Sequence, residues 1–311
     1  MTDNRNDLNG IFLNNKDSFR SWVDPESGEV RQGLLLSPEE INQTMQQQAV
    51  NAARRQYMHE KTELSEEVSM LAHGKGFFFC KYNQFLQSIQ NDYASAFRFL
   101  YISTYADYNG MLCKRDRKNK STAMTKDELC SFFRCNERVN RRILAQLQES
   151  GLILEKNGCF YINDKYSIRG SLKITEKQEV TRVFINGVRQ LYTRSDAKEH
   201  KKIGRIIALL EFMHTDTNIL CRNPLESDWD EIQPLTMNDV CEILGYERRA
   251  TNVVQPMLLS PRIYDLSILG IFWDGKKKVI VVNPYLFYSG SDPQAIRWVV
   301  SLFKMMPDMA K

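Results

Sequence analysis

Three arginines at helical spacing carry the most distinctive chemistry in this sequence. Arg138 and Arg141 stand three residues apart and therefore fall on one side of a helix, with Arg142 at its flank. A guanidinium group donates paired hydrogen bonds to planar acceptors, among them carboxylates, phosphates and the edge of guanine. Asn136 stands directly before this helix and adds an amide. These four side chains are suited to recognising acceptor groups on a partner.

A helix that presents these arginines needs a second side to bury, and the surrounding sequence predicts one. Its apolar residues recur at roughly 100° per residue on the side opposite the arginines. They are Val139, Ile143, Leu144 and Leu147. Asn136 is placed to cap the start of this helix, and Ser150-Gly151 to end it. A shorter helix capped by Thr125 is predicted before it. Its apolar positions are Leu129, Phe132 and Phe133.

A β-hairpin is predicted directly after the basic helix. Leu152–Leu154 and Cys159–Tyr161 are short apolar strands, and the polar Glu155–Gly158 between them is a turn. The stretch Met124–Tyr161 then has the order helix, tight turn, basic helix and hairpin, which is the order of a winged helix. A helical hairpin with an ordinary solvated basic face is the alternative. The added β-hairpin favours nucleic-acid binding.

The same order of elements occurs twice in the chain. Thr125–Arg138 aligns without a gap with Thr236–Arg249, at an offset of 111 residues. Three further pairs of windows follow in the same order: Phe79–Leu86 with Phe184–Leu191 at 105, Met111–Cys113 with Ile219–Cys221 at 108, and Tyr161–Gly170 with Val281–Gly290 at 120. One such window is easily met by chance, but four in order are not. We therefore predict two copies of one winged-helix domain, at about 78–171 and 183–291.

The alignment assigns recognition residues to the second copy. Arg249 and Asn252 correspond to Arg138 and Arg141, and Arg248 lies beside them. Arginine can bond guanine through two hydrogen bonds and asparagine can do the same with adenine, so these residue types suit base edges in a major groove. The second recognition helix is therefore predicted to project Arg249 and Asn252.

The hairpin of the second copy is predicted from strands at Ile271–Trp273 and Val279–Val282 with a turn at Asp274–Lys278. The turn carries three lysines, Lys276, Lys277 and Lys278. They suit a phosphate or minor-groove contact, and a solvated turn is the alternative. Pro256 lies within or at the end of the preceding helix and should kink or shorten it.

Local charge differs between the two copies. In the first copy the run Lys114–Lys120 holds five basic residues and one acidic residue, and its Lys114 and Arg115, together with Arg142, are assigned to the phosphate backbone. In the second copy Asn223–Tyr246 holds six acidic residues and no basic one. That run would repel phosphates unless it faces away. The second copy either binds DNA only through its helix and hairpin or serves protein contacts.

Further elements are expected before and between the copies. Trp22–Leu36 is typical of a hairpin or arm with a turn at its centre. Ser37–Glu40 combines an N-cap, a proline at the first helical position and a glutamate at the third, so it predicts a helix that runs to about His59. This helix packs on its own domain or on another subunit. Thr62–Lys75 is predicted as a linker, and Thr175–Thr193 as a helix that opens the second copy.

The predicted fold class is mainly α with small β wings (α+β), comprising two tandem winged-helix domains and an N-terminal helical extension. The predicted domains are residues 1–75 for the arm and helix, 76–172 for the first winged helix, 173–291 for the second with its linking helix, and 292–311 for a C-terminal helix. Pro293 begins this last helix. Its apolar face should cap a core with Ile296, Val299, Val300, Phe303 and Met306.

Composition limits the classes of protein to which the chain could belong. The 311 residues are 42% hydrophobic and 26% charged, which is ordinary for a soluble globular protein, and a net charge of +4 is too small to make the whole surface attract polyanions. The seven cysteines are scattered, so reduced thiols are expected, and Cys130 and Cys135 lack the partners of a closed zinc site. No metal or other cofactor is expected. No stretch approaches the roughly 18 apolar residues of a membrane span, and the first residues lack the apolar run of a signal peptide, so a cytoplasmic location is expected.

The segments that follow the two hairpins carry a resemblance to a known family. YINDKYSIRG at Tyr161–Gly170 and VVNPYLFYSG at Val281–Gly290, joined to the T-x-x-[DE]-[LV]-C helix-turn-helix, resemble the winged-helix domains of replication initiator proteins of plasmids and phages from Gram-positive bacteria. In that group a hairpin strand commonly runs into an Asn-Pro-aromatic segment ending near glycine. The resemblance covers about residues 76–291. It implies a tandem winged-helix protein that binds repeated origin DNA, often as a dimer. Asp164 replaces the proline in the first copy, and residues 1–75 have no counterpart.

The leading hypothesis is sequence-specific binding of duplex DNA, with each recognition helix in a major groove and basic loops on phosphates. Its most specific form is a plasmid or phage replication initiator. A transcriptional regulator of a mobile element is one alternative, and a winged-helix protein-interaction module is another. A homodimer through the N-terminal helix or the first domain is compatible with the sequence, and neither a membrane nor a small-molecule substrate is expected. Catalysis is not expected either, because the four histidines are isolated and no GxxxxGK[ST] nucleotide loop is present.

Overall fold

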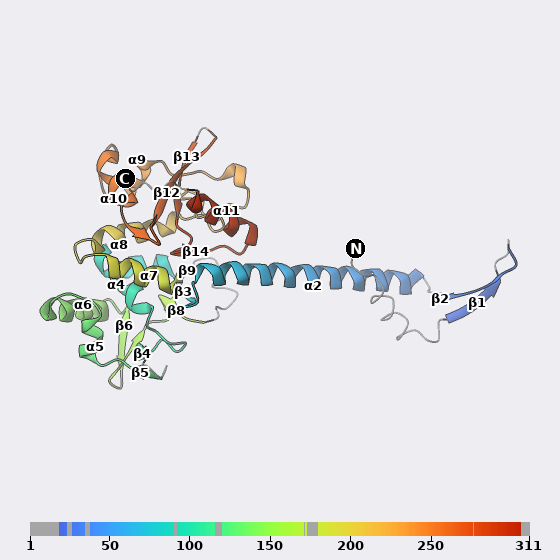
Figure 1. The fold of residues 1–311 in the computed structure, drawn as a ribbon, viewed down its shortest axis with the longest axis horizontal. Coiled ribbons are helices and arrows are strands. Elements are labelled where there is room, and N and C mark those ends of the chain that lie inside the picture. Colours follow the sequence, from blue (N-terminus) through green and yellow to red (C-terminus); the bar gives the residue numbers. More distant parts are fainter. Residues whose placement is uncertain are drawn as a thin grey trace. The chain divides into compact units, whose positions relative to one another are not determined.

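The computed structural model of the 311-residue chain describes residues 19–23, 27–34, 38–89, 92–115, 120–170, 172, 180–275 and 277–305. The chain divides into two compact units, one ending at Thr62 and the other beginning at Glu63. The described residues form ten α-helices and several small antiparallel sheets, so the fold is mixed α and β. Figure 1 shows these elements in chain order.

Helix α2 (Pro38–Leu71) follows a hairpin of strands β1 (Phe19–Val23) and β2 (Val30–Leu34). It begins at the predicted proline but continues twelve residues past His59, so the linker predicted at Thr62–Lys75 was wrong. The last turns of the helix carry Val68 and Leu71, which are 7% and 1% exposed in the core of the larger unit. Tertiary burial therefore extends a helix whose own polar sequence suggested an earlier end.

The larger unit contains two halves that share one order of elements. The first half runs through β3 (Phe77–Cys80), α3 (Tyr82–Ser88), α4 (Tyr93–Ser103), β4 (Cys113–Arg115), β5 (Ser121–Ala123), α5 (Lys126–Ser131), α6 (Glu137–Glu149), β6 (Ile153–Lys156), β7 (Cys159–Ile162) and β8 (Ser167–Ile168). The second half runs through β9 (Thr181–Phe184), α7 (Ile185–Arg194), α8 (His200–Ala208), the 3-10 turns η3 (Leu209–Phe212) and η4 (Trp229–Glu231), α9 (Met237–Ile243), α10 (Thr251–Leu259), β10 (Arg262–Ile263), β11 (Leu266–Ser267), β12 (Leu269–Asp274), β13 (Lys277–Val282) and β14 (Phe287–Tyr288).

A four-stranded antiparallel sheet in the order β14-β9-β3-β8 joins the two halves (Figure 1). Strands β3 and β9 lie at its centre, with Phe79 opposite Arg182. The helix predicted across Thr175–Thr193 was therefore wrong at residues 181–184, where Val183 and Phe184 are fully buried in a strand that is paired on both edges. The helix itself begins only at Ile185, and residues 173–179 lie outside the described part of the chain.

The same backbone hydrogen bonds recur in both halves. Corresponding bonds join Leu112 to Phe160 and Leu220 to Ile280, Cys113 to Tyr105 and Cys221 to Phe212, and Ile162 to Gly110 and Val282 to Asn218. The strand register corrects one predicted offset. Cys80 pairs with Ser167 in the first half, and Val183 pairs with Phe287 in the second. Corresponding residues of the two central strands are therefore 103 positions apart in the sequence, and not 105 as predicted. The hairpin exits keep their offset of 120.

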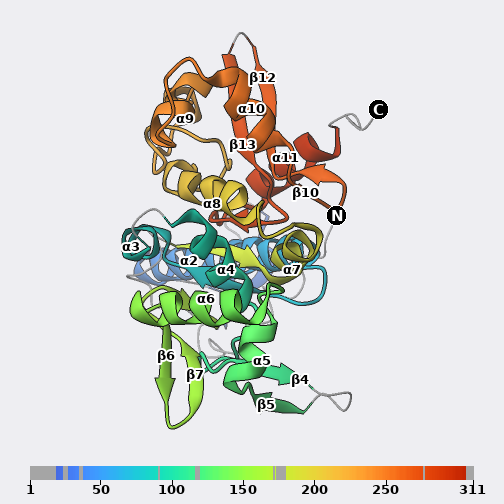
Figure 2. The same ribbon diagram turned by 90° about the vertical axis from the view of Figure 1, so that its left-hand side faces the viewer.

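Helices α4 and α8 pack against each other between the halves (Figure 2). A Cβ atom added to Gly204 would lie 1.6 Å from the carbonyl oxygen of Tyr93, so the two backbones are in direct contact. The rings of Phe97 and His200 meet edge to face, with centroids 5.4 Å apart. Tyr93 corresponds to His200, and Phe97 to Gly204, since each pair is 107 residues apart in the sequence. The contact of Tyr93 with Gly204 is therefore the equivalent, in the exchanged halves, of the contact of His200 with Phe97.

Helix α11 (Pro293–Lys304) follows the second half and is capped by Asp292. Its buried residues include four that were predicted for its apolar face: Ile296, Val299, Val300 and Phe303. Met306, the fifth, lies outside the described residues. Arg297 binds Glu67 at 2.7 Å and so ties this helix to the end of α2. Among the described helices, none combines the length and apolar character that crossing a bilayer requires.

Candidate nucleic-acid interface

Helices α5 and α6 are defined by their side-chain caps. The Thr125 hydroxyl accepts from the backbone N–H of Glu128, whose carboxylate accepts from the N–H of Thr125 in return, which is a capping box. The Asn136 Oδ1 accepts from the N–H of Val139 at 2.9 Å, as predicted. The buried Asn140 of α6 donates to the carbonyl of Cys135 and accepts from its N–H. These two bonds hold the turn residue Cys135 against the start of α6.

Helix α6 buries one face and exposes its arginines on the other. Ile143, Leu144 and Leu147 are at most 1% exposed. Arg141 forms an ion pair with Glu137 one turn earlier. Arg138 and Arg142 are exposed and have no hydrogen bond or ion pair within the part of the chain that the structure describes. Two unpaired guanidinium groups therefore face outward from a helix whose other face is locked in the core.

The basic hairpin of the first half is tied to the helix beside it. Lys114 on β4 forms an ion pair with Glu128 of the capping box. The hydrogen bond from Lys114 is the largest cause that lowers the pKa of Glu128. Arg115 is exposed on the same strand. Lys114 thus already has a carboxylate partner, whereas Arg115 has no ion pair among the residues that the structure describes.

The first wing-like hairpin is formed by β6 and β7, which pair from Ile153 opposite Ile162 to Lys156 opposite Cys159. Its two-residue turn places Asn157 at φ 51° and Gly158 at φ 73°, the left-handed conformation that asparagine and glycine tolerate. The predicted hairpin is confirmed, but its strands have four residues each, and the turn is Asn157-Gly158 and not the predicted Glu155–Gly158.

The second helix-turn-helix begins like the first but ends differently. Thr236 and Asp239 form the same capping box before α9. Helix α10, however, starts only at Thr251, so Arg248 and Arg249 lie in the preceding turn and not on the helix as predicted. The residue that corresponds to Asn136 is Glu247, and α10 has no side-chain cap. Without that cap, the residues that would form the first turn of the helix remain in the loop before it.

The recognition residues of the second half are therefore arranged differently from those of the first. Asn252 is exposed on the first turn of α10, and Arg249 is exposed just before it. The Arg248 guanidinium lies 3.7 Å from a carboxylate oxygen of Glu242. Pro256 is accommodated inside the nine-residue helix, which is shorter than the thirteen-residue α6.

The second hairpin is longer than the first, with six residues in each of β12 and β13. Lys277 and Lys278 are exposed near its tip, and Lys276 lies outside the described residues. The Lys278 ammonium sits 5.0 Å from the centre of the Trp273 ring, which is 68% exposed. This pair presents a cation and an aromatic face together at the end of the hairpin.

Helices α6 and α10 lie on one side of the larger unit. Figure 2 turns this side to the viewer, with α6 below and α9 and α10 above the central helices. The hairpins β6-β7 and β12-β13 extend at opposite ends of the unit. The arrangement along this side is hairpin, helix, helix and hairpin.

Metal and thiolate chemistry find no support among the described residues, where no three histidine, cysteine or acidic side chains gather as metal ligands. Burial raises the pKa of the Cys80 and Cys130 thiols and raises that of Cys221 to about 11. These thiols are neutral at physiological pH and buried among apolar side chains.

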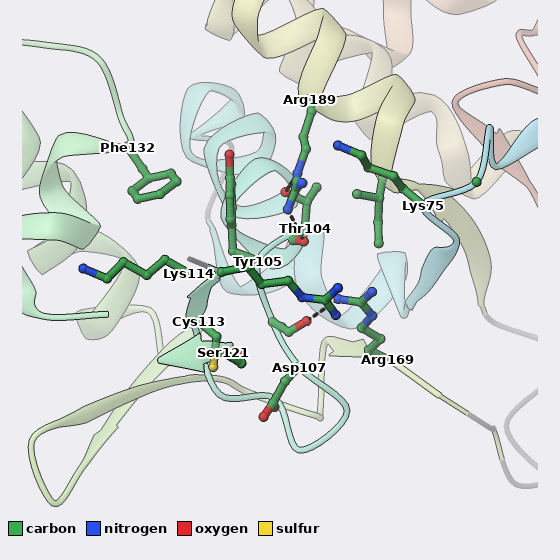
Figure 3. A pocket seen from close by; sticks show the side chains of 14 residues that line it. Lys75, Thr104, Tyr105, Asp107, Cys113, Lys114, Ser121, Phe132, Arg169 and Arg189 are labelled. Carbon is green, nitrogen blue, oxygen red and sulfur yellow. Dashed lines mark hydrogen bonds between the residues drawn. The ribbon is translucent and has the colours of Figure 1, made fainter. Parts of the chain in front are cut away.

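One group of basic residues was missed by reasoning from the sequence. Arg169 and Arg189 line a cavity of about 650 Å³, together with Lys75, Lys114 and Arg115 (Figure 3). The sequence carries no signal for Arg189, and Arg169 appears only within the hairpin exit Tyr161–Gly170. Their proximity depends on the packing of the two halves, which no local pattern reveals.

Comparison of the chain with family models, curated proteins and solved structures finds no match.

Proposed function

We propose that the protein binds duplex DNA in a sequence-specific way through two tandem winged-helix domains, one in each half of the larger unit. The observation that carries the proposal is the outward face of α6, where Arg138 and Arg142 are exposed and unpaired within the described part of the chain. A buried opposite face and a capped start hold this helix rigidly. A rigid helix with free guanidinium groups suits the major groove.

The pairing of the halves supports a tandem reader. Helices α6 and α10 lie on one side of the unit and the hairpins lie at its two ends (Figure 2). On one DNA duplex the helices would enter successive major-groove segments, and the hairpin lysines Lys277 and Lys278 would lie against the backbone or minor groove. The exposed acidic residues of η4 would stay off the DNA.

Replication initiation is the most specific form of this proposal. It rests on the resemblance of the helix-turn-helix and of the two hairpin exits to plasmid and phage initiators. Selecting bound fragments from native DNA separates the possibilities. Enrichment of direct repeats supports an initiator, and a short palindrome near promoters supports a transcriptional regulator.

The direct test is the double variant Arg138→Ala with Arg141→Ala. Loss of base contacts typically costs about 1–3 kcal/mol each, so affinity for a selected site should fall by a few kcal/mol in an anisotropy titration. Arg54→Ala with Lys304→Ala removes the same charge from α2 and α11 and should leave the affinity nearly unchanged. Equal affinity of the wild type and the recognition-helix variant would sink the proposal.

A protein-interaction role of the second half has one observation in its favour. Trp229 in η4 is 49% exposed, among the acidic residues Asp228, Asp230 and Glu231. Its ring lies 5.5 Å from that of Trp298, beside a cavity of about 400 Å³. An exposed tryptophan within an acidic segment is typical of a protein contact and not of a DNA contact. Trp229→Ala should then leave DNA affinity unchanged while weakening binding of a protein partner.

A further inference from the structure

The cavity lined by Arg169 and Arg189 has an unusual charge balance. It lies where the end of α4, strand β4 and helix α7 meet, and its volume is about 650 Å³. Its basic residues are Lys75, Lys114, Arg115, Arg169 and Arg189. Asp107 is the one acidic residue among those that line it in the described chain. Because Lys114 is paired with Glu128, four cations are left beside one carboxylate.

Arg189 is a partly buried guanidinium with neutral partners. Its Nε donates to Thr104 Oγ1 at 3.0 Å and its Nη2 to the Thr104 carbonyl at 2.8 Å. The group stacks on Tyr105, 4.1 Å from the ring centre. Burial is the main cause that lowers the pKa of Arg189; Tyr105 and Tyr101 raise it, and the charges of Arg169 and Arg115 lower it further. A desolvated cation beside other cations is unfavourable unless an anion joins it.

The one carboxylate of the cavity is engaged elsewhere. Asp107 Oδ1 accepts from the backbone N–H groups of Asn109 and Met111, at 2.9 and 2.8 Å, and so closes the turn after α4. Figure 3 shows its side chain directed away from Arg169 and Arg189. Arg169 is oriented instead by the Ala106 carbonyl at 2.7 Å. The arginines are held in place by neutral acceptors, and within the described chain no carboxylate pairs with either of them.

The positions that correspond to Arg189 and Tyr105 in the other half are apolar. The strand offset of 103 matches Arg189 on α7 with Leu86 on α3, and the helix offset of 107 matches Tyr105 with Phe212. Leu86 and Phe212 are both partly buried against the hydrophobic core. The fold therefore does not require an arginine at the position of Arg189.

We propose that this cavity binds a phosphate group, carried by a nucleotide-sized phosphorylated small molecule. Its volume lies within the range of about 300–1,000 Å³ that is usual for small-molecule sites. Two or more guanidinium groups bind phosphate through paired, charge-assisted hydrogen bonds. Arg189 comes from the second half while Arg115 and Arg169 come from the first, so the bound anion bridges the halves. A backbone phosphate of DNA offers the same chemistry and is separated by the test below.

The test uses isothermal titration calorimetry and thermal unfolding of the full chain with inorganic pyrophosphate, ATP and GTP. Saturable binding and a rise in Tm are expected for the wild type. Arg189→Leu, which copies Leu86, should weaken binding at least tenfold, and its Tm rise with ligand is measured against its own free Tm because the change also removes two hydrogen bonds to the buried Thr104. Arg169→Gln is a second variant with the same expected loss. The matched control is Arg194→Leu on the same helix, where the arginine is exposed and paired with Asp265.

Each result decides between sources or ends the proposal. Tight binding of ATP, GTP or pyrophosphate that Arg189→Leu abolishes identifies a free ligand. If those compounds bind only weakly but Arg189→Leu lowers DNA affinity and reduces its salt slope by about one, the phosphate belongs to DNA and the free-ligand proposal is overturned. Equal behaviour of wild type, Arg189→Leu and Arg194→Leu with all three compounds and with DNA overturns the phosphate site altogether. None of these results depends on Arg138 or Arg141, so the DNA-reading proposal stands or falls separately.

Discussion

Helices α6 and α10 occupy corresponding places in the two halves and differ in how they begin. Both follow a helix with the same threonine capping box. Helix α6 then starts at a side-chain cap, Asn136, and runs for thirteen residues, whereas α10 has no such cap and runs for nine. The difference moves Arg249 off the helix while Arg138 stays on it. One scaffold thus carries two different outward surfaces.

The hairpins differ in the opposite sense from the helices, because the longer hairpin belongs to the second half. Strands β12 and β13 have six residues each and those of the first hairpin have four. The longer hairpin brings Lys277 and Lys278 to its exposed end. Under the proposed DNA-binding function, the first half is expected to contact bases through its helix and the second half to contact the backbone through its hairpin.

The contact between α4 and α8 should be the most sensitive to change. Gly204→Ala places a methyl group where the Tyr93 carbonyl lies, 1.6 Å from its oxygen, and neither backbone can move without disturbing the core. We expect a loss of more than about 3 kcal/mol in the free energy of unfolding, measured with urea. Lys201→Ala, on the exposed face of α8, is the control and should change it little. An unchanged midpoint for Gly204→Ala would show that the halves do not pack as described.

Each half has an asparagine directly after its β6-β7 or β12-β13 hairpin, and these two residues allow a direct comparison of the halves. Asn283 is fully buried and donates to the Ser267 carbonyl at 2.8 Å, while Asn163 is partly exposed and donates to the Gly151 carbonyl at 2.8 Å. Asn283→Ala leaves buried polar groups without partners and should cost about 3 kcal/mol. Asn163→Ala should cost about 1 kcal/mol because water can replace the amide. Equal losses in chemical denaturation would contradict this ranking.

His200 holds in the second half the place of Tyr93 in the first. Burial, and secondly the charge of Arg98, lower the pKa of His200 from 6.5 to about 4. The unfolded histidine takes up a proton as the pH falls through 6.5, but the folded one does not until about 4, so stability is greatest above 6.5 and is lost towards 4. The free energy of unfolding should fall by roughly 2 kcal/mol from this group between pH 7 and pH 5.

His200→Tyr, which copies the first half, removes this group and tests its contribution. Unfolding by denaturant at several pH values should show a shallower dependence for this variant, and His59→Gln in α2 should keep the wild-type dependence. A variant profile parallel to that of the wild type from pH 7 to pH 5 would show that His200 is not the responsible group.

The divided surfaces predict unequal effects of two matched arginines. Arg138→Ala removes a guanidinium from the rigid first turn of α6 and should weaken specific DNA binding by about 1–2 kcal/mol. Arg249→Ala removes one from the turn before α10 and should cost less than half as much. Anisotropy titrations of both variants on one selected site at constant salt measure the difference. A larger loss for Arg249→Ala would reverse the assignment of the reading half.

The hairpins should give the smallest effect, visible mainly in salt dependence. Lys277→Gln with Lys278→Gln removes two phosphate contacts and should reduce the slope of log affinity against log salt by about two. Lys156→Gln at the tip of the first hairpin should reduce it by one at most. Titrations between about 50 and 200 mM salt measure both slopes. Over this range the affinity should fall roughly tenfold or more. Equal slopes for the two variants would remove the anchoring role of the second hairpin.

Local sequence determined much of the first helix-turn-helix and its hairpin. Thr125 and Asn136 cap through their own side chains, the apolar residues of α6 follow one helical period, and Asn157-Gly158 suits a two-residue turn. Helix α11 was predicted for the same reason, from its proline and its apolar spacing. Each of these signals acts over a few residues, so the sequence alone reveals it.

Tertiary structure decided the features that depend on residues far apart in the chain. Thr181–Phe184 is a strand because β3 and β14 pair with it, and α2 continues to Leu71 because its last turns are buried. Arg189 lies beside Arg169 and Tyr105 only because α7 of one half packs against the other. Backbone pairing, burial and uncompensated charge are properties of surroundings that assemble only on folding. The sequence by itself therefore predicted helices α5, α6 and α11 and the β6-β7 hairpin, and the packing of the two halves created the basic cavity.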